Sequence, residues 1–516
     1  MKELVSPILL ASVIIPFVVS VIMPILKLKP KRLATLSFLS LLVPLLTSSY
    51  YIMFSMVGKG IVDPIYFRHP LIGGFTMLLD SLSSPLVFSI ALVTALVAIY
   101  SLTYMKHRME EMRKEGEWHP SWGIYYMLYT MFSAAMIGTV LSTNLIEFYI
   151  FLELTLIPSF LLIAFYGYGN KIRIAIMYLI WTHVGALFFL LGTVIFGSNV
   201  GTFDILNVET MQFNIGLGQQ LPSTIVFGAL IAIIIGLFIK MAIFGVHIWL
   251  PYAHAEAPTP VSALLSPNLI GIAGYALIRI GYTLFPESFL TVSPYMIILA
   301  LITMIYGGLM ALAQDDFKRL LAYSSISQMG YILLGVASLT SFGFTGAMVH
   351  YISHAAGKAI LFMVAGTLIV QLNGLRSISK MGGIATKMPI TGSLALIGFM
   401  HITGIPPTIG FWSEILIVFG IIQRVSESGS IIFMLLAAGL VIAIALSTGY
   451  AFLTMKRIFF GAIPDNLKET AKDAKIGLTI GMAITGAIGL LLFFYPNLFI
   501  DPLMKFVSTI FGLGGS

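Results

Sequence analysis

The sequence predicts an all-α polytopic membrane protein with about fourteen transmembrane helices. The first observation is composition: 58% of the 516 residues are hydrophobic, 9% are charged, and the mean hydropathy is +1.00. A soluble domain carries roughly 25% charged residues. The second is that apolar runs of membrane-spanning length recur along the chain. The third is that two of these runs are interrupted by glycine and proline at matching positions.

The apolar runs reach the length of about 20 residues that a helix needs to cross the hydrocarbon. We place fourteen predicted spans near residues 4–26, 33–57, 78–104, 122–141, 144–166, 172–197, 223–249, 259–284, 292–313, 319–338, 342–370, 388–422, 430–456 and 476–498. The runs 342–370 and 388–422 are too long for one straight crossing, so we expect tilts, kinks or breaks there.

The distribution of basic residues predicts the orientation. Most of the 28 Lys and Arg fall in alternate loops, beginning with Lys27–Arg32 and including Lys318 and Arg319. The positive-inside rule places these loops in the cytoplasm and the N-terminus outside. Arg279 is expected at a helix end, which leaves only Lys240 and Lys358 within predicted spans.

Five-helix sets 4–8 and 9–13 are predicted to be inverted repeats. Helix 7 is interrupted at Gly245 to Pro251 and helix 12 at Gly404 to Pro407. Such paired interruptions are typical of a midplane ion site in a transporter. The predicted units are listed here in order: residues 1–121 (helices 1–3), 122–285 (first repeat), 286–460 (second repeat) and 461–516 (a loop and helix 14).

The absence of cysteine excludes disulfides, iron–sulfur ligation and thiol chemistry within the chain. No haem or flavin motif is present, so we expect no cofactor. The net charge of +7 does not indicate nucleic-acid binding, because in a membrane protein the location of the charges matters more than their sum.

The charged residues within spans are few and costly, at roughly 2.5 to 3.5 kcal/mol each on insertion scales. Glu153 on helix 5 is a candidate partner of Lys240 on helix 7, because neighbouring opposite charges stabilise each other. The alternative for Glu153 is a buried structural acid bonded to a hydroxyl. Glu147, nearer the helix end, is interpreted first as an interfacial carboxylate.

The second half contains His350, His354 and Lys358, spaced i, i+4, i+8 on one face of helix 11. Such a row favours a proton relay. A metal site at the two histidines is the alternative, although no third ligand has suitable spacing. Glu414, after the helix 12 break, is the expected partner of Lys358.

Three further polar positions have open interpretations. His183 and His247 either extend the path from Lys240 or only form structural hydrogen bonds. Asp80, at the start of helix 3, is expected to cap that helix.

Four stretches then resemble the signature sequences of antiporter-like subunits. They are NLIEFYIFLELTLIPSFLLI, VHIWLPYAHAEAPTPVSALL, FKRLLAYSSISQMGYILLG and HYISHAAGKAILF. Such subunits occur in respiratory complex I, in Mrp-type Na+/H+ antiporters and in membrane-bound hydrogenases. The resemblance covers about residues 75–460 in order.

The resemblance implies a proton path along the membrane midplane. The matching positions here are Glu153, Lys240, His350, His354, Lys358 and Glu414. We also expect His247 to lie on this path and His183, Glu147 and Asn268 to support it. Many relatives carry a lysine or histidine midway along helix 8, where this chain has Gly271 with only Ser266 and Asn268 as polar neighbours. Either water bridges this gap or the path between the halves is weakened.

The resemblance also implies a function. It indicates a subunit that moves H+, or exchanges H+ for Na+, within a redox-driven complex and has no redox centre of its own. The alternative is a subunit of a Na+/H+ antiporter without a redox partner; a purely structural scaffold is disfavoured by the broken helices. Expected partners are small antiporter-type subunits, a quinone- or hydrogenase-type module and the lipid of a prokaryotic plasma membrane, with no nucleic acid.

Overall fold

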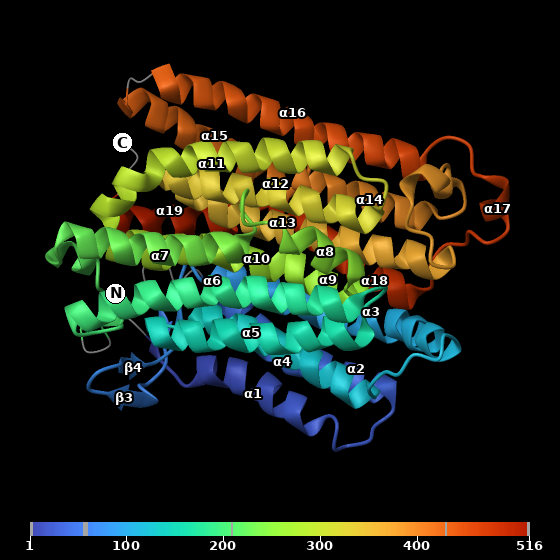
Figure 1. The fold of residues 1–516 in the computed structure, drawn as a ribbon, viewed down its shortest axis with the longest axis horizontal. Coiled ribbons are helices and arrows are strands. Elements are labelled where there is room, and N and C mark those ends of the chain that lie inside the picture. The colour runs from blue at the N-terminus through green and yellow to red at the C-terminus, as the bar shows by residue number, and fades with distance from the viewer. Residues whose placement is uncertain (1–3, 55–59, 208–209, 429–430, 513–516) are drawn as a thin grey trace.

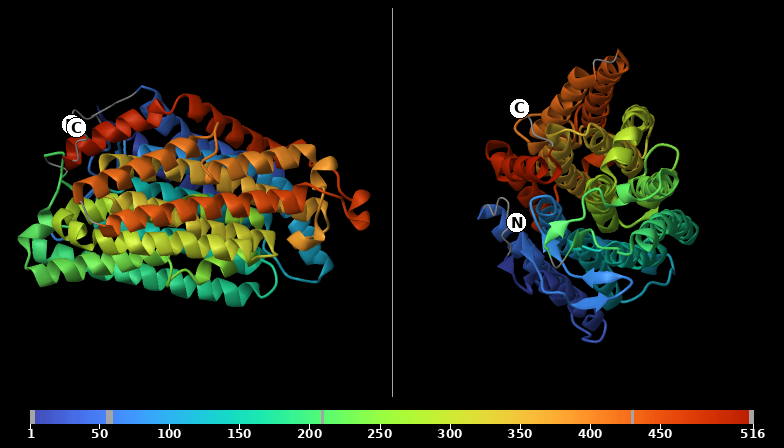
Figure 2. Two further views of the ribbon diagram at one scale, coloured as in Figure 1. Left: turned by 90° about the horizontal axis from the view of Figure 1, so that it is seen from above. Right: turned by 90° about the vertical axis from the view of Figure 1, so that its left-hand side faces the viewer.

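The helices form one elongated bundle in which most run side by side along the long axis (Figure 1). This computed structural model describes residues 4–54, 60–207, 210–428 and 431–512. The parts of predicted spans 33–57 and 430–456 that fall in the gaps lie outside the described residues. The described chain begins and ends at the same end of the bundle, here called the terminal end (Figures 1 and 2). The opposite end, which carries α17, is called the loop end.

The first part of the chain runs from α1 to the end of helix 8. Its helices are α1 (Ile8–Ile22), α2 (Pro30–Met53), α3 (Ser84–Lys114), α4 (Trp122–Leu141), α5 (Leu145–Tyr166), α6 (Lys171–Val200), η1 (Leu217–Gln220), α7 (Ser223–Met241), α8 (Trp249–Glu256), α9 (Thr259–Leu264), η2 (Leu265–Leu269), α10 (Ile270–Ala276) and η3 (Leu277–Tyr282).

The second part completes the bundle. Its helices are α11 (Pro286–Leu312), α12 (Phe317–Ala337), α13 (Ser341–Gln371), η4 (Ile378–Lys380), η5 (Ile384–Thr386), α14 (Pro389–Ile402), α15 (Ile409–Ser428), α16 (Ile431–Phe459), α17 (Asp465–Lys468), α18 (Ile476–Phe494) and α19 (Asn497–Phe511). The helix α19 follows the last predicted span and was not expected from hydropathy, because it is too short to cross a membrane.

Thirteen helical spans among the described residues are long and apolar enough to cross a membrane. They confirm the predicted all-α membrane fold. The first predicted span, 4–26, corresponds to α1, which has only 15 residues. The long run 388–422 is divided between α14 and α15. The inverted repeat of sets 4–8 and 9–13 stays a prediction.

Helix 7 is broken, although not where its proline lies. The first segment, α7, ends at Met241, and Ala242 and Gly245 both adopt positive φ. The second segment, α8, begins at Trp249, so Pro251 is the third residue of its first turn. Proline is tolerated there because the first N–H groups of a helix have no intrahelical acceptor. The predicted break at Gly245 to Pro251 is therefore corrected to residues 242–248.

Helix 12 is broken where the sequence predicts. The segment α14 ends at Ile402, and α15 begins at Ile409 after the Gly404 to Pro407 stretch. Gly404 has a φ of 61°, in the left-handed region that glycine occupies without strain. Both predicted interruptions are thus present in the structure.

Short strands join loops at the terminal end. The strands β1 (Leu4–Val5), β2 (Ile61–Val62) and β5 (Leu78–Leu79) form one sheet, with β1–β2 parallel and β2–β5 antiparallel. Two antiparallel pairs are formed by β3 (Phe67–His69) with β4 (Gly73–Phe75), and by β6 (Leu206–Asn207) with β7 (Gln212–Phe213). These pairs satisfy backbone groups between the helices.

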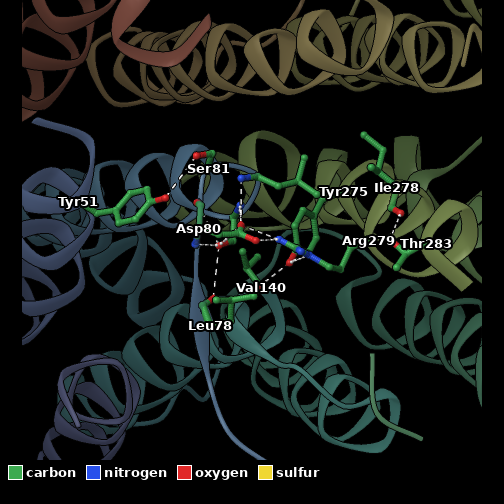
Figure 3. Close-up of polar contacts among 11 residues, drawn as sticks. Tyr51, Leu78, Asp80, Ser81, Val140, Tyr275, Ile278, Arg279 and Thr283 are labelled. Carbon is green, nitrogen blue, oxygen red and sulfur yellow. Dashed lines mark hydrogen bonds and ion pairs between the residues drawn. The ribbon is translucent and has the colours of Figure 1, made fainter. Parts of the chain in front are cut away.

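A buried ion pair joins helix 8 to the start of helix 3 (Figure 3). Nη2 of Arg279 lies 2.6 and 2.7 Å from the carboxylate oxygens of Asp80, and Nε donates to the hydroxyl of Tyr275. The same carboxylate accepts the backbone N–H groups of Leu82 and Ser83 in the turn before α3. The N-cap of α3 is Ser83, so the prediction that Asp80 caps this helix is corrected. Arg279 is buried in the last turn of η3, which agrees with its predicted place at a helix end.

Two basic residues that the sequence placed in loops are buried at the loop end. Arg108 donates to the carbonyls of Tyr166 and Gly167 at the end of α5. Lys318 donates to the carbonyls of Ala255 and Ala257 at the end of α8. Cations are favourable at the carbonyl ends of helices, so both residues act as caps.

Candidate functional site

Glu153 lies on α5 and is bonded to α6. Its Oε2 lies 3.1 Å from Nδ1 of His183. The two side chains are 22% and 48% exposed, so this pair lies on the outer face of α5 and α6. The alternative interpretation of Glu153 as a buried acid bonded to a hydroxyl is therefore wrong.

Lys240 lies in the last turn of α7, just before the break, and its side chain is 3% exposed. In the part of the chain that the structure describes, its Nζ has no hydrogen-bond partner. Glu153 is the carboxylate whose charge acts on Lys240, but the two groups form no ion pair. The predicted direct Glu153–Lys240 ion pair is therefore not formed, and the two charges act on each other without a direct contact.

Glu147 is buried at the start of α5. It is in the first turn of α5, and its Oε2 accepts the N–H of Thr143 at 3.1 Å. Two acids in the adjoining loops, Asp63 and Asp204, have their pKa raised by burial. The oxygen of Glu147 thus satisfies the backbone just before α5, and its interpretation as an interfacial carboxylate stays a prediction.

His247 lies in the break of helix 7 and fixes the loop to α11. The N–H of Gly245 donates to Nδ1 at 3.2 Å, so Nε2 carries the proton and donates to the Tyr306 hydroxyl at 3.1 Å. Thr303 on α11 accepts the N–H of Phe244 in the same loop. The contacts of His247 are those of a structural hydrogen-bonding residue.

His350 on α13 is held by two neighbouring helices. Its Nε2 lies 3.0 Å from Oε1 of Gln328 on α12, and its Nδ1 lies 3.0 Å from the Ser413 hydroxyl on α15. The ring stacks on Tyr331. Gln328 also donates to the Tyr450 hydroxyl on α16, so a polar network links four helices around His350.

Lys358 is fully buried and is bonded to α12. Its Nζ donates to the carbonyl of Leu321, at 3.0 Å, and to the Ser324 hydroxyl. Among the described residues it forms no ion pair with Glu414, so the expected Lys358–Glu414 pair is not formed in this structure. The lysine instead crosslinks α13 to α12.

Glu414 lies on the other side of the helix 12 break. A Cβ atom added to Gly404 would lie 2.5 Å from Oε2 of Glu414, so this carboxylate is packed against the break itself. Within the described ranges its Oε1 has no hydrogen-bond partner. Its charge acts on Tyr331 and Tyr450, which places it beside the network around His350.

His254 on α8 is a site residue that the sequence did not single out. It is fully buried against Phe362, and neither ring nitrogen has a hydrogen-bond partner in the described part of the chain. The charges of Lys318 and Lys358 both act on it, and it acts in turn on His354. His254, in the first half, therefore lies near the buried lysines of α12 and α13.

His401, at the end of α14, is a second missed residue. It is fully buried, and its Nδ1 lies 3.2 Å from the Ser353 hydroxyl on α13. A signal was available: α7 and α14 each end in a turn that carries a basic side chain, Lys240 in one and His401 in the other.

Helix 8 is closely packed where relatives of the resembled family carry a titratable group. A Cβ atom on Gly271 would lie 2.5 Å from the ring of Tyr351, so that ring fills the space. The hydroxyl of Tyr351 donates to the carbonyl of Asn268. Ser266 lies 2.6 Å from Ser325, whereas the side-chain amide of Asn268 has no partner among the described residues.

A metal site finds no support in this geometry. No group of three or more His, Asp or Glu side chains among the described residues could hold a metal ion. The imidazole of His350 is engaged on both nitrogens by Ser413 and Gln328.

Comparisons with family models match two parts of the chain. Residues 142–444 match the model described as NADH:quinone oxidoreductase/Mrp antiporter, transmembrane region. Residues 73–113 match the model described as NADH-ubiquinone oxidoreductase (complex I), chain 5 N-terminus.

Individual relatives and structures agree with these models. The F(420)H(2) dehydrogenase subunit M of Methanosarcina mazei is 32% identical over an alignment of 465 positions that covers 86% of each chain. The fold matches a chain of the Mrp complex from Dietzia sp. with a TM-score of 0.84 at 21% identity, covering 98% of this chain and 97% of that one. It matches a chain of respiratory complex I from Thermus thermophilus with a TM-score of 0.79 at 25% identity, covering 98% and 100%.

Proposed function

Because this chain belongs to the NADH:quinone oxidoreductase/Mrp antiporter family, we propose that it is an antiporter-like, ion-translocating membrane subunit of a redox-driven complex. The complex would be of the membrane-bound hydrogenase or NADH dehydrogenase type. The observation that carries this proposal is the row of buried titratable side chains between two broken helices. A relative of similar length is a dehydrogenase subunit, which supports a redox-driven complex over a free-standing antiporter.

The proposed path uses the residues that the sequence singled out. They are Glu153, Lys240, His247, His350, His354, Lys358 and Glu414, supported by His183, Glu147 and Asn268. Moving one charge across the membrane is worth about 2.3 kcal/mol per 100 mV. Changing the partners of a buried lysine alters its proton affinity by energies of this size, since one pKa unit is about 1.36 kcal/mol.

The chain itself is proposed to move ions and to hold no redox group. Electron transfer would be the work of partner subunits, namely a quinone- or hydrogenase-type module, and small antiporter-type subunits would complete the membrane part. The location proposed is a prokaryotic plasma membrane with the N-terminus outside, as the basic loops indicate. The ion is H+, or H+ exchanged for Na+.

The repeat is proposed to divide the chain as the sequence suggests. Units 122–285 and 286–460 would be the two inverted halves, flanked by 1–121 and 461–516. Support comes from the two broken helices and from the basic side chain that ends the segment before each break. Irregular backbone at membrane depth is tolerated where it is buried in protein or lines a wet cavity.

A secondary Na+/H+ antiporter subunit without a redox partner is the second candidate. The TM-score of 0.84 to a chain of an Mrp complex supports it at the level of the fold.

The test is to purify the assembly from its native membrane through an affinity tag on this chain. We expect iron–sulfur or hydrogenase-like subunits to copurify, and proton movement in vesicles to start when an electron donor and acceptor are added. An assembly that contains only small membrane subunits and exchanges Na+ for H+ without any electron donor would contradict the redox-driven function.

A further inference from the structure

A cavity of about 430 Å³ lies at the terminal end of the bundle. It is lined by the first turns of α11 and α13 and by the ends of α15 and α19. A water molecule occupies about 30 Å³ in the liquid, so the cavity has room for the end of a side chain and is far larger than a single bare ion requires. Its polar lining residues are Glu287, Thr340, Ser341, Gln423, Arg424 and Glu427.

The buried part of this lining includes a hydroxyl without a partner. Ser341 is 2% exposed, and its Oγ has no hydrogen-bond partner within the described ranges. The neighbouring hydroxyl of Thr340 differs, because it accepts the N–H of Gly343 and lies 3.1 Å from the hydroxyl of Ser338. Buried polar groups normally have a partner, so Ser341 indicates that a polar group enters this cavity.

Two exposed carboxylates line the same cavity. Glu287 lies in the first turn of α11, where the helix dipole favours an acid. Glu427 lies one residue before the end of α15, where the dipole disfavours an acid unless a cation is close. Nε2 of Gln423 donates to Oε1 of Glu427 at 3.0 Å and so positions this carboxylate. Arg424 lines the cavity as well, so the lining carries one net negative charge, which a single added cation would neutralise.

We propose that this cavity, here called the terminal acidic cavity, receives the ammonium group of a lysine from a partner subunit. An ammonium group has three N–H donors, which match the three acceptors Glu287, Glu427 and Ser341. A guanidinium group presents its donors in a planar fork that is suited to one carboxylate, so it matches this set less well.

The apolar lining residues fit the rest of a lysine side chain. Tyr282, Leu290 and Leu339 line the cavity, and lysine packs its methylene stem along apolar surface while its charged end stays with polar groups. A free amine would be held only weakly, because water screens ion pairs at exposed carboxylates. A lysine on a docked subunit is presented at a high effective concentration. The inference therefore rests on the proposed function, under which this chain is one subunit of a larger membrane complex.

The test is a zero-length crosslink in the intact complex, purified through a tag on this chain. A water-soluble carbodiimide joins a carboxylate to a contacting amine as an amide and takes up the water that is lost. Ethylamine is added as a competing free amine. We expect mass spectrometry to find Glu287 or Glu427 joined to a lysine of another subunit. Glu469, an exposed glutamate that does not line the cavity, should couple to ethylamine and is the control for reactivity.

The contribution of the lining is measured with the double variant Glu287→Gln/Glu427→Gln and with Ser341→Ala. Retention of the linked subunit through a wash at raised ionic strength should fall about tenfold in the double variant, because the lysine loses both charged acceptors. Ser341→Ala removes one neutral acceptor and should reduce retention about threefold. Glu469→Gln is the matched control and should retain the subunit as the unaltered chain does.

Three results would overturn the role of the terminal acidic cavity. The first is that Glu287 and Glu427 form no amide with another subunit and couple to ethylamine as readily as Glu469. The second is that the linked lysine belongs to this same chain. The third is that the double variant retains the subunit fully. None of these results bears on the redox-driven function, which is judged by the subunits that copurify and by the response to an electron donor.

Discussion

The two broken helices of this protein hold their charges differently. At the first break, Lys240 is buried with no hydrogen-bond partner among the described residues, and the acid that acts on it, Glu153, lies on the outer face of α5. At the second break, His401 is anchored to α13 through Ser353, and Glu414 is packed against Gly404. At the first break the basic residue is unanchored among the described residues and the acid lies on the outer face, whereas at the second break the basic residue is anchored and the acid is packed against the break.

The difference extends to the two lysines within the spans. Lys358 is held by a carbonyl and a hydroxyl of α12, whereas Lys240 has no such anchor. A buried charge without partners is costly, and its partners are what fix its position. We infer that the second half fixes its lysine by direct bonds and that the first half leaves its lysine responsive to Glu153.

The largest expected effect is a difference in thermal stability between variants of Lys358 and of Lys240. Lys358→Met removes the ammonium that donates to the Ser324 hydroxyl and the Leu321 carbonyl. Hydrogen bonds from a charged group contribute about 1.5–3 kcal/mol, so we expect a loss of this size. Lys240→Met removes an ammonium that donates no hydrogen bond and should leave stability unchanged or higher. Thermal unfolding of the two purified variants checks this contrast, and equal losses would show that Lys240 is also anchored.

An intermediate effect is expected at the second break. Gly489→Ala places a methyl group 2.1 Å from the ring of His401 and forces the imidazole to move. Overpacking of this kind costs about 1–3 kcal/mol. Gly486→Ala on the same helix is the control, because its methyl would lie 3.3 Å from the nearest atom, in Ile397. Proton movement and melting temperature should fall in the first variant only; equal effects would mean that His401 has room to shift.

The smallest effect is expected at the loop end, where each half of the chain has an acid whose pKa is lowered by a hydrogen bond. A hydrogen bond from Lys171 lowers the pKa of Glu117 in the first half, and one from Ser377 lowers the pKa of Asp315 in the second. Because both folded pKa values are depressed, these acids stabilise the fold above their unfolded pKa values. That stability is lost as the pH falls through the folded values.

Glu117→Gln and Asp315→Asn should therefore each lower the melting temperature slightly near neutral pH and leave it nearly unchanged in acid, where the native carboxyl is already protonated. The effects should be small because Asp315 is exposed, Glu117 is partly exposed, and solvent screens both charges. A variant that loses stability equally at all pH values would show that its acid acts through packing and not through charge.

Hydropathy predicted the spans well because the bilayer thickness sets helix length directly. The position of the first break was predicted less well. Gly245 and Pro251 both indicate an interruption, but Pro251 fits the first turn of α8, and the chain turns at Ala242 instead. A residue with a side chain in the left-handed region gives no local signal of its conformation.

The partners of the buried charges could not be predicted from the sequence. Lys358 bonds a carbonyl and a serine of α12. Carbonyls and hydroxyls of this kind occur on many helices, so the sequence did not mark these two as partners and Glu414 was predicted instead. The sequence placed Arg279 at a helix end and Lys318 in a loop. It could not show that Arg279 binds Asp80 or that Lys318 binds the end of α8, because only packing brings these groups together. His254 and His401 were missed because a single histidine carries no spacing to interpret.

The most direct test of the proposed function is proton movement by Lys240→Ala in vesicles that contain the intact complex. Lys387→Ala, at an exposed position in a loop-end segment, is the control for loss of a positive charge. We predict that Lys240→Ala assembles normally and loses coupled proton movement by about 100-fold or more, as expected for a positioned proton-transfer group, while Lys387→Ala behaves as the unaltered protein. Undiminished proton movement by a fully assembled Lys240→Ala complex would contradict the account.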